Sequence, residues 1–330
     1  MKENEILPYW FLMSYSFEIL SHASMIISGV DKKIIIDPWL NGPAYWHSWW
    51  HFPEPKTLNK DKIDYVFLTH FHEDHFHLNT LKNFPKKTNF VVPLFPNANL
   101  KPVLKENGFN NITELNHGDK FIIEDGFEVF SYQTSWNDDS ALIIKIGDKL
   151  IANLNDAKFG DSTLKYISKV HGPIDFFLKS HSSATGYPDC FKSKDPNDLL
   201  LIDKEHYYKA FIKNAIALKS KYLIPFASHV CFLHKDTFKL KNTVINPYDM
   251  KKYLSGNKKI KSKIKLMIPG DSWSKNEGFK ISKQIKSSDY EPQIKKMYIE
   301  KQEEIKQYDQ KLLEENQLTF NDFNTYFSEY

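Results

Sequence analysis

The chain has 330 residues, 41% of them hydrophobic, and a formal net charge of +3. This content supports a buried core in one large or two smaller domains. The small charge does not by itself argue for nucleic-acid binding, and no apolar run approaches the ~20 residues that span a bilayer. The two cysteines, Cys190 and Cys231, fit no disulfide framework or zinc ribbon, which predicts reduced thiols in a cytoplasmic protein.

Short strands are predicted along the first fifth of the chain. Apolar runs at residues 17–20, 25–28 and 33–36 are separated by turns, and the third run ends in Asp37-Pro38. A further apolar run at residues 63–68 indicates a buried strand. That strand leads directly into a loop of unusual composition.

The loop, LTHFHEDHFH at residues 68–77, places His70, His72, Asp74 and His75 in the order H-x-H-x-D-H. A strand precedes the loop and a helix-like stretch follows it, which favours a metal site over a solvated histidine-rich loop. Imidazole and carboxylate together suit Zn, Fe or Mn rather than Ca. Because Asp74 and His75 cannot easily serve the same ion as His70 and His72, the spacing predicts two divalent metal ions.

Beyond the loop, strands and helices are interspersed. The elements predicted next are a strand at 89–92, a helix at 99–106, a strand at 112–115, and a β-meander at 121–123, 127–132, 141–146 and 150–154. After residue 160, helices at 162–170 and 206–220 alternate with strands at 174–179 and 222–225. This order predicts an α/β fold, an αββα sandwich with two sheets face to face and helices outside.

A charged helix pattern covers residues 293–317, with Glu and Lys three and four residues apart. We therefore expect a main domain at residues 1–284 and a helical appendage at residues 285–330.

The H-x-H-x-D-H motif after a buried strand resembles the metallo-β-lactamase superfamily, whose fold is the αββα sandwich. The segment IIIDPWLNGPAYWHSWW at residues 34–50 is similar to the metal-binding domain of the CMP-N-acetylneuraminate hydroxylase family. Further matches are ATGYP at residues 184–188, and PFA at residues 225–227 followed by His234.

The resemblance implies further metal ligands. It implies that Asp156, directly after a strand, bridges the two metals, and that His234, or else His229, is a late ligand. The family has a histidine where this chain has Trp136. Either Asp138 or Asp139 replaces it, or the first site is incomplete, which would leave a mononuclear enzyme or a non-catalytic relative. A carboxylate there would shift the preference from Zn toward Fe or Mn.

The remaining candidates concern substrate and proton transfer. We expect Asp74 to orient a water and take a proton, and His181 to transfer protons at a strand end. The candidate substrate-binding residues are His22, Trp39, Lys179 and Tyr187. All 44 basic residues are lysines, so an anionic substrate would be held by Lys, backbone N–H groups or metal, without a bidentate Arg fork.

Two chemistries are compatible with these residues. The first expectation is a dinuclear metallohydrolase, in which metal-bound hydroxide attacks a lactone, ester or phosphodiester. The alternative, implied by the hydroxylase resemblance, is a non-haem diiron oxygenase acting on an anionic or nucleotide-activated sugar. Because Cys190 and Cys231 have no C-x-H or C-x-x-H setting for a Rieske cluster, that enzyme would need an electron-donor protein.

Overall fold

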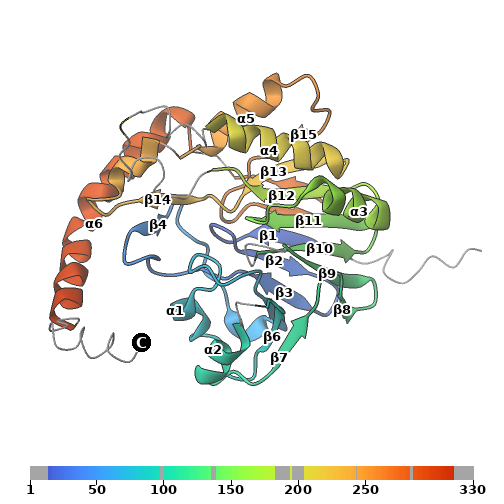
Figure 1. The fold of residues 1–330 in the computed structure, drawn as a ribbon, viewed down its shortest axis with the longest axis horizontal. Helices are drawn as coiled ribbons and strands as arrows, with labels where there is room; N and C mark the ends of the chain where they lie inside the picture. The colour runs from blue at the N-terminus through green and yellow to red at the C-terminus, as the bar shows by residue number, and fades with distance from the viewer. Residues whose placement is uncertain are drawn as a thin grey trace, which may run out of the picture.

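The computed structural model of the chain describes residues 14–96, 100–134, 139–182, 194, 204–242, 244–282 and 285–315. Two large sheets pack face to face, and helices cover their outer faces (Figure 1). The predicted αββα sandwich is therefore confirmed. No helix among these described residues is long and apolar enough to cross a membrane.

The first sheet has eight strands in the order β17-β16-β1-β2-β3-β5-β6-β7. Its strands are β1 Ser16–Ile19, β2 Met25–Ser28, β3 Lys33–Ile36, β5 Tyr65–Phe67, β6 Asn89–Pro93, β7 Ile112–Leu115, β16 Ser272–Ser274 and β17 Gly278–Lys280. The pairs β3–β5, β5–β6 and β6–β7 are parallel, so their carboxyl ends lie along one edge of the sheet.

The second sheet has seven strands in the order β15-β13-β12-β11-β10-β9-β8. Its strands are β8 Lys120–Glu124, β9 Phe127–Gln133, β10 Ser140–Ile146, β11 Lys149–Asn155, β12 Phe176–Ser180, β13 Tyr222–Phe226 and β15 Lys263–Ile264. Strands β8 to β11 pair antiparallel in succession, which confirms the predicted meander. Strands β11, β12 and β13 are parallel.

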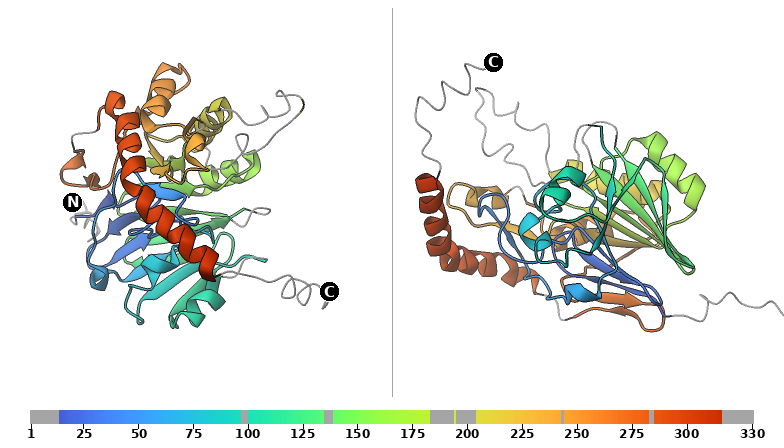
Figure 2. Two further views of the ribbon diagram at one scale, coloured as in Figure 1. Left: turned by 90° about the vertical axis from the view of Figure 1, so that its left-hand side faces the viewer. Right: turned by 90° about the horizontal axis from the view of Figure 1, so that it is seen from below.

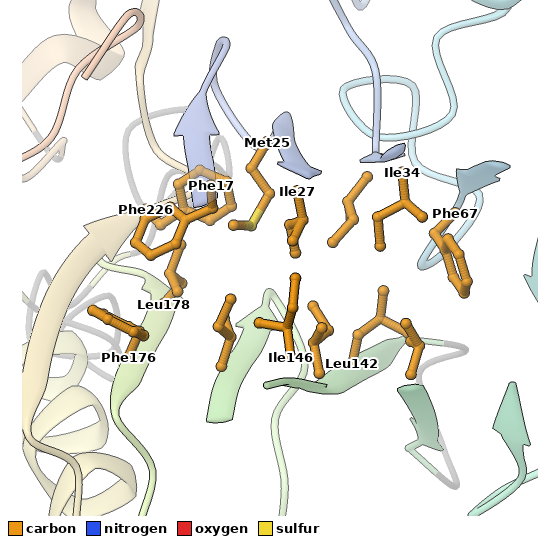
Figure 3. Packing of buried hydrophobic residues seen from close by; sticks show 14 of the residues in the cluster. Phe17, Met25, Ile27, Ile34, Phe67, Leu142, Ile146, Phe176, Leu178 and Phe226 are labelled. Atoms are coloured by element: carbon orange, nitrogen blue, oxygen red, sulfur yellow. The ribbon is translucent and has the colours of Figure 1, made fainter. Parts of the chain in front are cut away.

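The main core lies between the sheets. Alternation along each strand sends one set of apolar side chains inward, as the buried pattern of β1 and β2 illustrates. In Figure 3, Ile27 and Ile34 of the first sheet face Leu142 and Ile146 of the second. This dry interior fixes the spacing between the sheets, and hence the position of the loops at their edges.

Helices α1 Leu78–Leu81 and α2 Leu100–Glu106 cover the first sheet, and α3 Asp161–His171, α4 Lys204–Ala217 and α5 Pro247–Gly256 cover the second. Helix α3 shows why the helices cover the sheets: its polar positions face solvent, while Leu164 and Ile167 lie buried against the sheet. Helix α5 was not predicted, although Asn246 caps its first turn and Pro247 begins it.

A small third sheet pairs β4 Trp49–His51 with β14 Val230–Phe232. Helix α6, Ser287–Glu315, lies beside it along the outside of the molecule (Figure 2). The pattern predicted this helix from residue 293, after Pro292, but the helix continues through the proline and begins at Ser287. Strands of two or three residues, such as β4, β14, β15, β16 and β17, are too short to show periodicity and were not predicted.

Candidate metal centre

The H-x-H-x-D-H loop begins where β5 ends, at the edge where parallel strands finish. Parallel pairing of β3 with β5 puts Asp37, just past β3, beside the start of this loop, and its N–H donates to Phe67 O at 2.9 Å. The facing sheet contributes Asp156 just past β11 and Asp139 just before β10. Loop residues from both sheets therefore converge on one point.

Three overlapping groups of side chains lie with their ligand atoms within 4.8 Å of one another: His70, His72 and Asp139; His70, His75 and Asp156; and His22, Asp74 and His75. The separations are 3.4 Å from His70 Nε2 to Asp139 Oδ1, 3.5 Å from His75 Nε2 to Asp156 Oδ2, and 3.3 Å from His75 Nε2 to Asp74 Oδ2. Atoms at these separations can ligate common ions.

The ring nitrogens of two loop histidines are arranged as they would be around a bound metal ion. Among the described residues, the buried Nε2 atoms of His70 and His75 have no hydrogen bond. Their Nδ1 atoms do, since His70 Nδ1 lies 3.0 Å from Thr69 Oγ1 and His75 Nδ1 lies 2.8 Å from Asp37 Oδ2. A hydrogen bond on one ring nitrogen orients the other toward a metal, which is the usual arrangement around a protein-bound ion.

Asp37 organises this arrangement, and the sequence analysis did not assign it a role. Its carboxylate is fully buried and accepts hydrogen bonds from Thr69 N–H at 2.8 Å, Thr69 Oγ1 at 2.6 Å and Asn155 Nδ2 at 2.6 Å, besides facing His75 Nδ1. The backbone of Asp37 has φ = 43°, a left-handed conformation that aspartate adopts more readily than most residues. The sequence signal was an acid at a strand end before Pro38.

Tyr45 is a second residue without an earlier assignment. Its hydroxyl donates to Asp74 Oδ1 at 2.6 Å and its N–H donates to Glu73 Oε2 at 2.8 Å. Tyr45, Trp46 and His47 are all left-handed, with φ of 50°, 53° and 59°. A run of such residues is strained, so the loop is held by its contacts with the metal-loop acids. The composition of this Trp-rich segment gave no indication of a hydrogen bond to Asp74.

The close packing of acids and imidazoles in the cluster shifts the pKa values of individual side chains in opposite directions. Burial and the neighbouring His75 lower the pKa of His70 well below its ordinary value. Burial opposes protonation of His75, but the carboxylates of Asp74 and Asp37 outweigh it and raise its pKa well above the usual range. Burial and the nearby Asp156 raise the pKa of the Asp139 carboxyl to about 6. Because these carboxylates lie so close together, bound cations would stabilise their charged forms.

The late histidines do not join the cluster. His234 Nε2 lies 3.1 Å from Asp309 Oδ2 of α6, and its Nδ1 accepts the Asp236 N–H at 3.2 Å. His229 is buried and faces His181, with ring centroids 6.2 Å apart. Neither His229 nor His234 belongs to a ligand-spaced group among the described residues.

The other predicted residues take supporting positions. Lys179 is buried, and its ammonium donates to Ala157 O at 2.9 Å, next to Asp156. Trp39 is fully buried, and its ring lies edge-on to His22 at 5.6 Å between centroids, so it supports His22 from behind. The candidates Asp138 and Tyr187, and the aligned Trp136, lie outside the described residues.

A cavity of about 440 Å³ is lined by residues close in sequence to Asp139 and Asp156, although none of the cluster's own side chains lines it. Its wall includes Thr134, whose N–H donates to Asp139 O at 2.8 Å, and Lys158, two residues past Asp156. The full lining is Leu94, Phe95, Pro96, Asn116, His117, Gln133, Thr134, Lys158, Phe159, Gly160 and Thr163. This volume is within the range of small-molecule sites, and one half of the wall is apolar while the other offers amides and one cation.

Comparison with known proteins agrees with the superfamily resemblance. Residues 32–173 match the model of the beta-lactamase superfamily domain. A "Putative Rieske 2Fe-2S iron-sulfur protein" of Mycolicibacterium smegmatis is 29% identical over 51% of this chain and 34% of its own length. A cytidine monophosphate-N-acetylneuraminic acid hydroxylase of Danio rerio is 32% identical over 29% of this chain and 17% of its own length. The matches thus span about a third or less of these relatives.

Solved structures share the fold. CmlA, a diiron beta-hydroxylase from Streptomyces venezuelae, superposes with a TM-score of 0.55 at 13% identity, covering 79% of this chain and 53% of its own. An isothiocyanate hydrolase from Delia radicum gut bacteria gives a TM-score of 0.54 at 14% identity, covering 78% of this chain and 98% of its own. At such identities the likeness is one of fold.

Proposed function

We propose that this chain, which carries a beta-lactamase superfamily domain and has the metallo-β-lactamase fold, is a non-haem diiron oxygenase that hydroxylates a small anionic molecule. Its two metal positions would be held by His70, His72 and Asp139 on one side and by Asp74 and His75 on the other, with Asp156 between them.

The observation that carries this proposal is the identity of the third donor beside His70 and His72. Asp139 Oδ1 lies 3.4 Å from His70 Nε2, where an imidazole would complete a zinc-type set. Two histidines and one carboxylate with open positions are the donor set of non-haem iron oxygenases, and carboxylate oxygen suits iron or manganese better than zinc. Asp74 and Asp156 add further carboxylate to the neighbouring position.

The protein's own groups would set the conditions for the chemistry. Asp37 fixes the tautomer of His75, and Tyr45 orients Asp74. The chemistry that bound ferrous ions would supply is O₂ activation, in which one oxygen atom enters a C–H bond and the other leaves as water, with two electrons and two protons consumed. His70, Asp74, His75 and Asp139 are buried, whereas His72 is exposed and Asp156 partly exposed, so a substrate would reach the ions from the side of His72 and Asp156.

The electrons and the substrate come from outside these residues. Relatives at 29–32% identity are named as Rieske iron–sulfur protein and as hydroxylase of a cytidine monophosphate-linked sugar, which supports an iron–sulfur electron donor and an activated anionic substrate. We assign the substrate to the 440 Å³ cavity, where Lys158 would face its negative charge and Phe159 its apolar part. Lysine would act there as a point charge rather than a bidentate fork.

Hydrolysis remains the second candidate, since one feature of the site favours it. His70 and His75 each belong to two of the three ligand groups, so two ions would lie close enough to bind one water between them and lower its pKa toward ~7. With zinc in both positions, Asp74 would orient that water. The identity of the bound metal therefore separates the two functions.

The experiment is metal analysis of anaerobically purified protein, followed by ferrous reconstitution and O₂-consumption measurements with a chemical reductant. We expect about two irons per chain and reductant-dependent O₂ uptake. Zinc that resists replacement, with no O₂ uptake and with turnover of a lactone or phosphodiester panel, would overturn the oxygenase assignment in favour of hydrolysis.

Asp139 offers a matched pair of variants. Asp139→His restores three imidazoles, and we expect tighter zinc binding with at least a tenfold loss of O₂ uptake. Asp139→Glu keeps the carboxylate and should retain iron and most of the uptake. Equal uptake by the wild type and Asp139→His would show that the carboxylate does not determine the chemistry.

A further inference from the structure

Among the described residues, the second position of the proposed centre has fewer loop ligands than the first. The first metal position would have His70, His72 and Asp139, and Asp156, which lies with His70 and His75, would be shared between the two positions. Besides the shared Asp156, the H-x-H-x-D-H loop supplies Asp74 and His75 to the second position. Four protein ligands or three plus an exchangeable water are the common arrangements, so a further imidazole near Asp74 and His75 would complete it. The sequence pointed to His234 or His229.

Neither late histidine is free and near enough. Both ring nitrogens of His234 are engaged, by Asp309 of α6 and by the Asp236 N–H. The ring nitrogens of His229 have no hydrogen-bond partner among the described residues, but His229 shares no ligand-spaced group with Asp74, His75 or Asp156 there. A ligand from this end of the sequence would require rearrangement of buried groups.

His22, in the turn between β1 and β2, already has the needed position. Its Nε2 lies 3.0 Å from Asp74 Oδ2, and His75 Nε2 lies 3.3 Å from the same oxygen. Two ligands that each lie about 2.1 Å from one ion, at about 90–110° to each other, are about 3.0–3.4 Å apart. The rings of His22 and His75 are inclined at 81°, so their edges converge without stacking.

The surroundings hold this imidazole in place. His22 is 2% exposed, and its ring meets the edges of Trp39 and Trp49 at centroid distances of 5.6 and 6.2 Å. The turn is closed by the Leu20 N–H donating to Ser24 O at 2.8 Å. In this packing, Nε2 of the ring points toward Asp74. Packing of this kind is what preorganises a metal ligand.

From this geometry we infer that His22 is the imidazole ligand of the second metal, together with Asp74, His75 and Asp156. The second metal would then be tied to the β1–β2 turn of the first sheet instead of to the loops after β13. The inference rests on the proposed two-metal centre. The competing role is a hydrogen-bond donor that merely orients Asp74.

The test uses a substitution that separates the two roles. In His22→Gln the amide can still donate to Asp74, but it is a poor metal ligand. The full chain is stripped of metal and titrated with Co²⁺, and ions per chain and dissociation constants are read from ICP-MS and the visible d–d bands. We expect two ions in the wild type, and in His22→Gln one ion with the second weakened more than about 100-fold, beyond the loss of an outer hydrogen-bonding partner.

His229→Gln is the matched control, a buried histidine at the rival position, and should keep two ions. Two ions in His22→Gln with unchanged affinity, or loss of an ion in His229→Gln alone, would overturn the inference while leaving the centre intact. A wild type that binds fewer than two ions would overturn the two-metal centre itself.

A second measurement needs no variant, in case the substitution unfolds the turn. Wild-type chain labelled with ¹⁵N-histidine and loaded with ¹¹³Cd²⁺ should show a one-bond ¹¹³Cd–¹⁵N coupling at His22 Nε2. Coupling at His229 or His234 with none at His22 would refute the assignment.

Discussion

Asp37→Asn is the sharpest perturbation that the site offers. One oxygen of Asp37, Oδ2, faces three donors: Thr69 Oγ1 at 2.6 Å, Asn155 Nδ2 at 2.6 Å and His75 Nδ1 at 2.8 Å. Placing an NH₂ group there turns these acceptor contacts into donor–donor contacts. The left-handed backbone at φ = 43° suits asparagine, so the substitution tests the hydrogen bonds and not the backbone.

The three partners respond differently. The Thr69 hydroxyl can rotate, and Asn155 can turn over to offer its Oδ1, which has no hydrogen-bond partner among the described residues. His75 can pair with the new amide only by accepting at Nδ1, which moves its proton to Nε2, the atom that would bind metal. We expect a metal affinity about 10–100-fold weaker, and a metal-free protein less stable by about 1–3 kcal/mol.

The assay is a chelator-competition titration with Co²⁺, paired with urea unfolding of the metal-free chain. Asp64→Asn is the control, since Asp64 accepts the Lys33 N–H at 2.8 Å just before β5, at the opposite end of the strand from the metal loop. It should change metal affinity less than threefold. An Asp37→Asn protein with wild-type affinity would refute the claim that Asp37 sets the His75 tautomer.

Three further predictions follow from single contacts. Tyr45→Phe removes the 2.6 Å hydrogen bond to Asp74 and should weaken metal binding about tenfold in the same titration, with unchanged secondary structure by circular dichroism. The pKa of His75 is raised in the metal-free fold by Asp74 and Asp37, so its stabilisation is complete below the unfolded value of about 6.5 and is lost as pH rises through the folded value. Metal binding at pH 7 should therefore release this proton, which calorimetry in buffers of different ionisation enthalpy would detect; release unchanged in His75→Gln would contradict it. Phe177→Ala empties a fully buried position under α4 and should cost about 3–5 kcal/mol in urea unfolding, whereas the half-exposed Tyr166→Ala should cost less than about 1 kcal/mol.

The sequence by itself determined the layered fold and the metal loop. Alternating or continuous apolar runs of four to seven residues mark the strands, and these runs depend on local burial, which repeats with the period of the strand. The loop after β5 concentrates its histidines in a few positions, so a metal site can be predicted there from the local sequence alone. Asp156 was likewise predicted as a ligand, from the family resemblance and its place directly after a strand.

The tertiary structure decided which distant residues meet that loop. In the sequence, Asp37 is an ordinary acid at a strand end and Tyr45 an ordinary loop tyrosine. Parallel pairing of β3 with β5 brings Asp37 to His75. The strained turn at residues 45–47 brings Tyr45 to Asp74. His234 matched a family position, yet α6 engages it through Asp309, a contact 75 residues away in sequence. Contacts of this kind arise from how two sheets and a helix pack together, and the periodicity of a local sequence does not predict that packing.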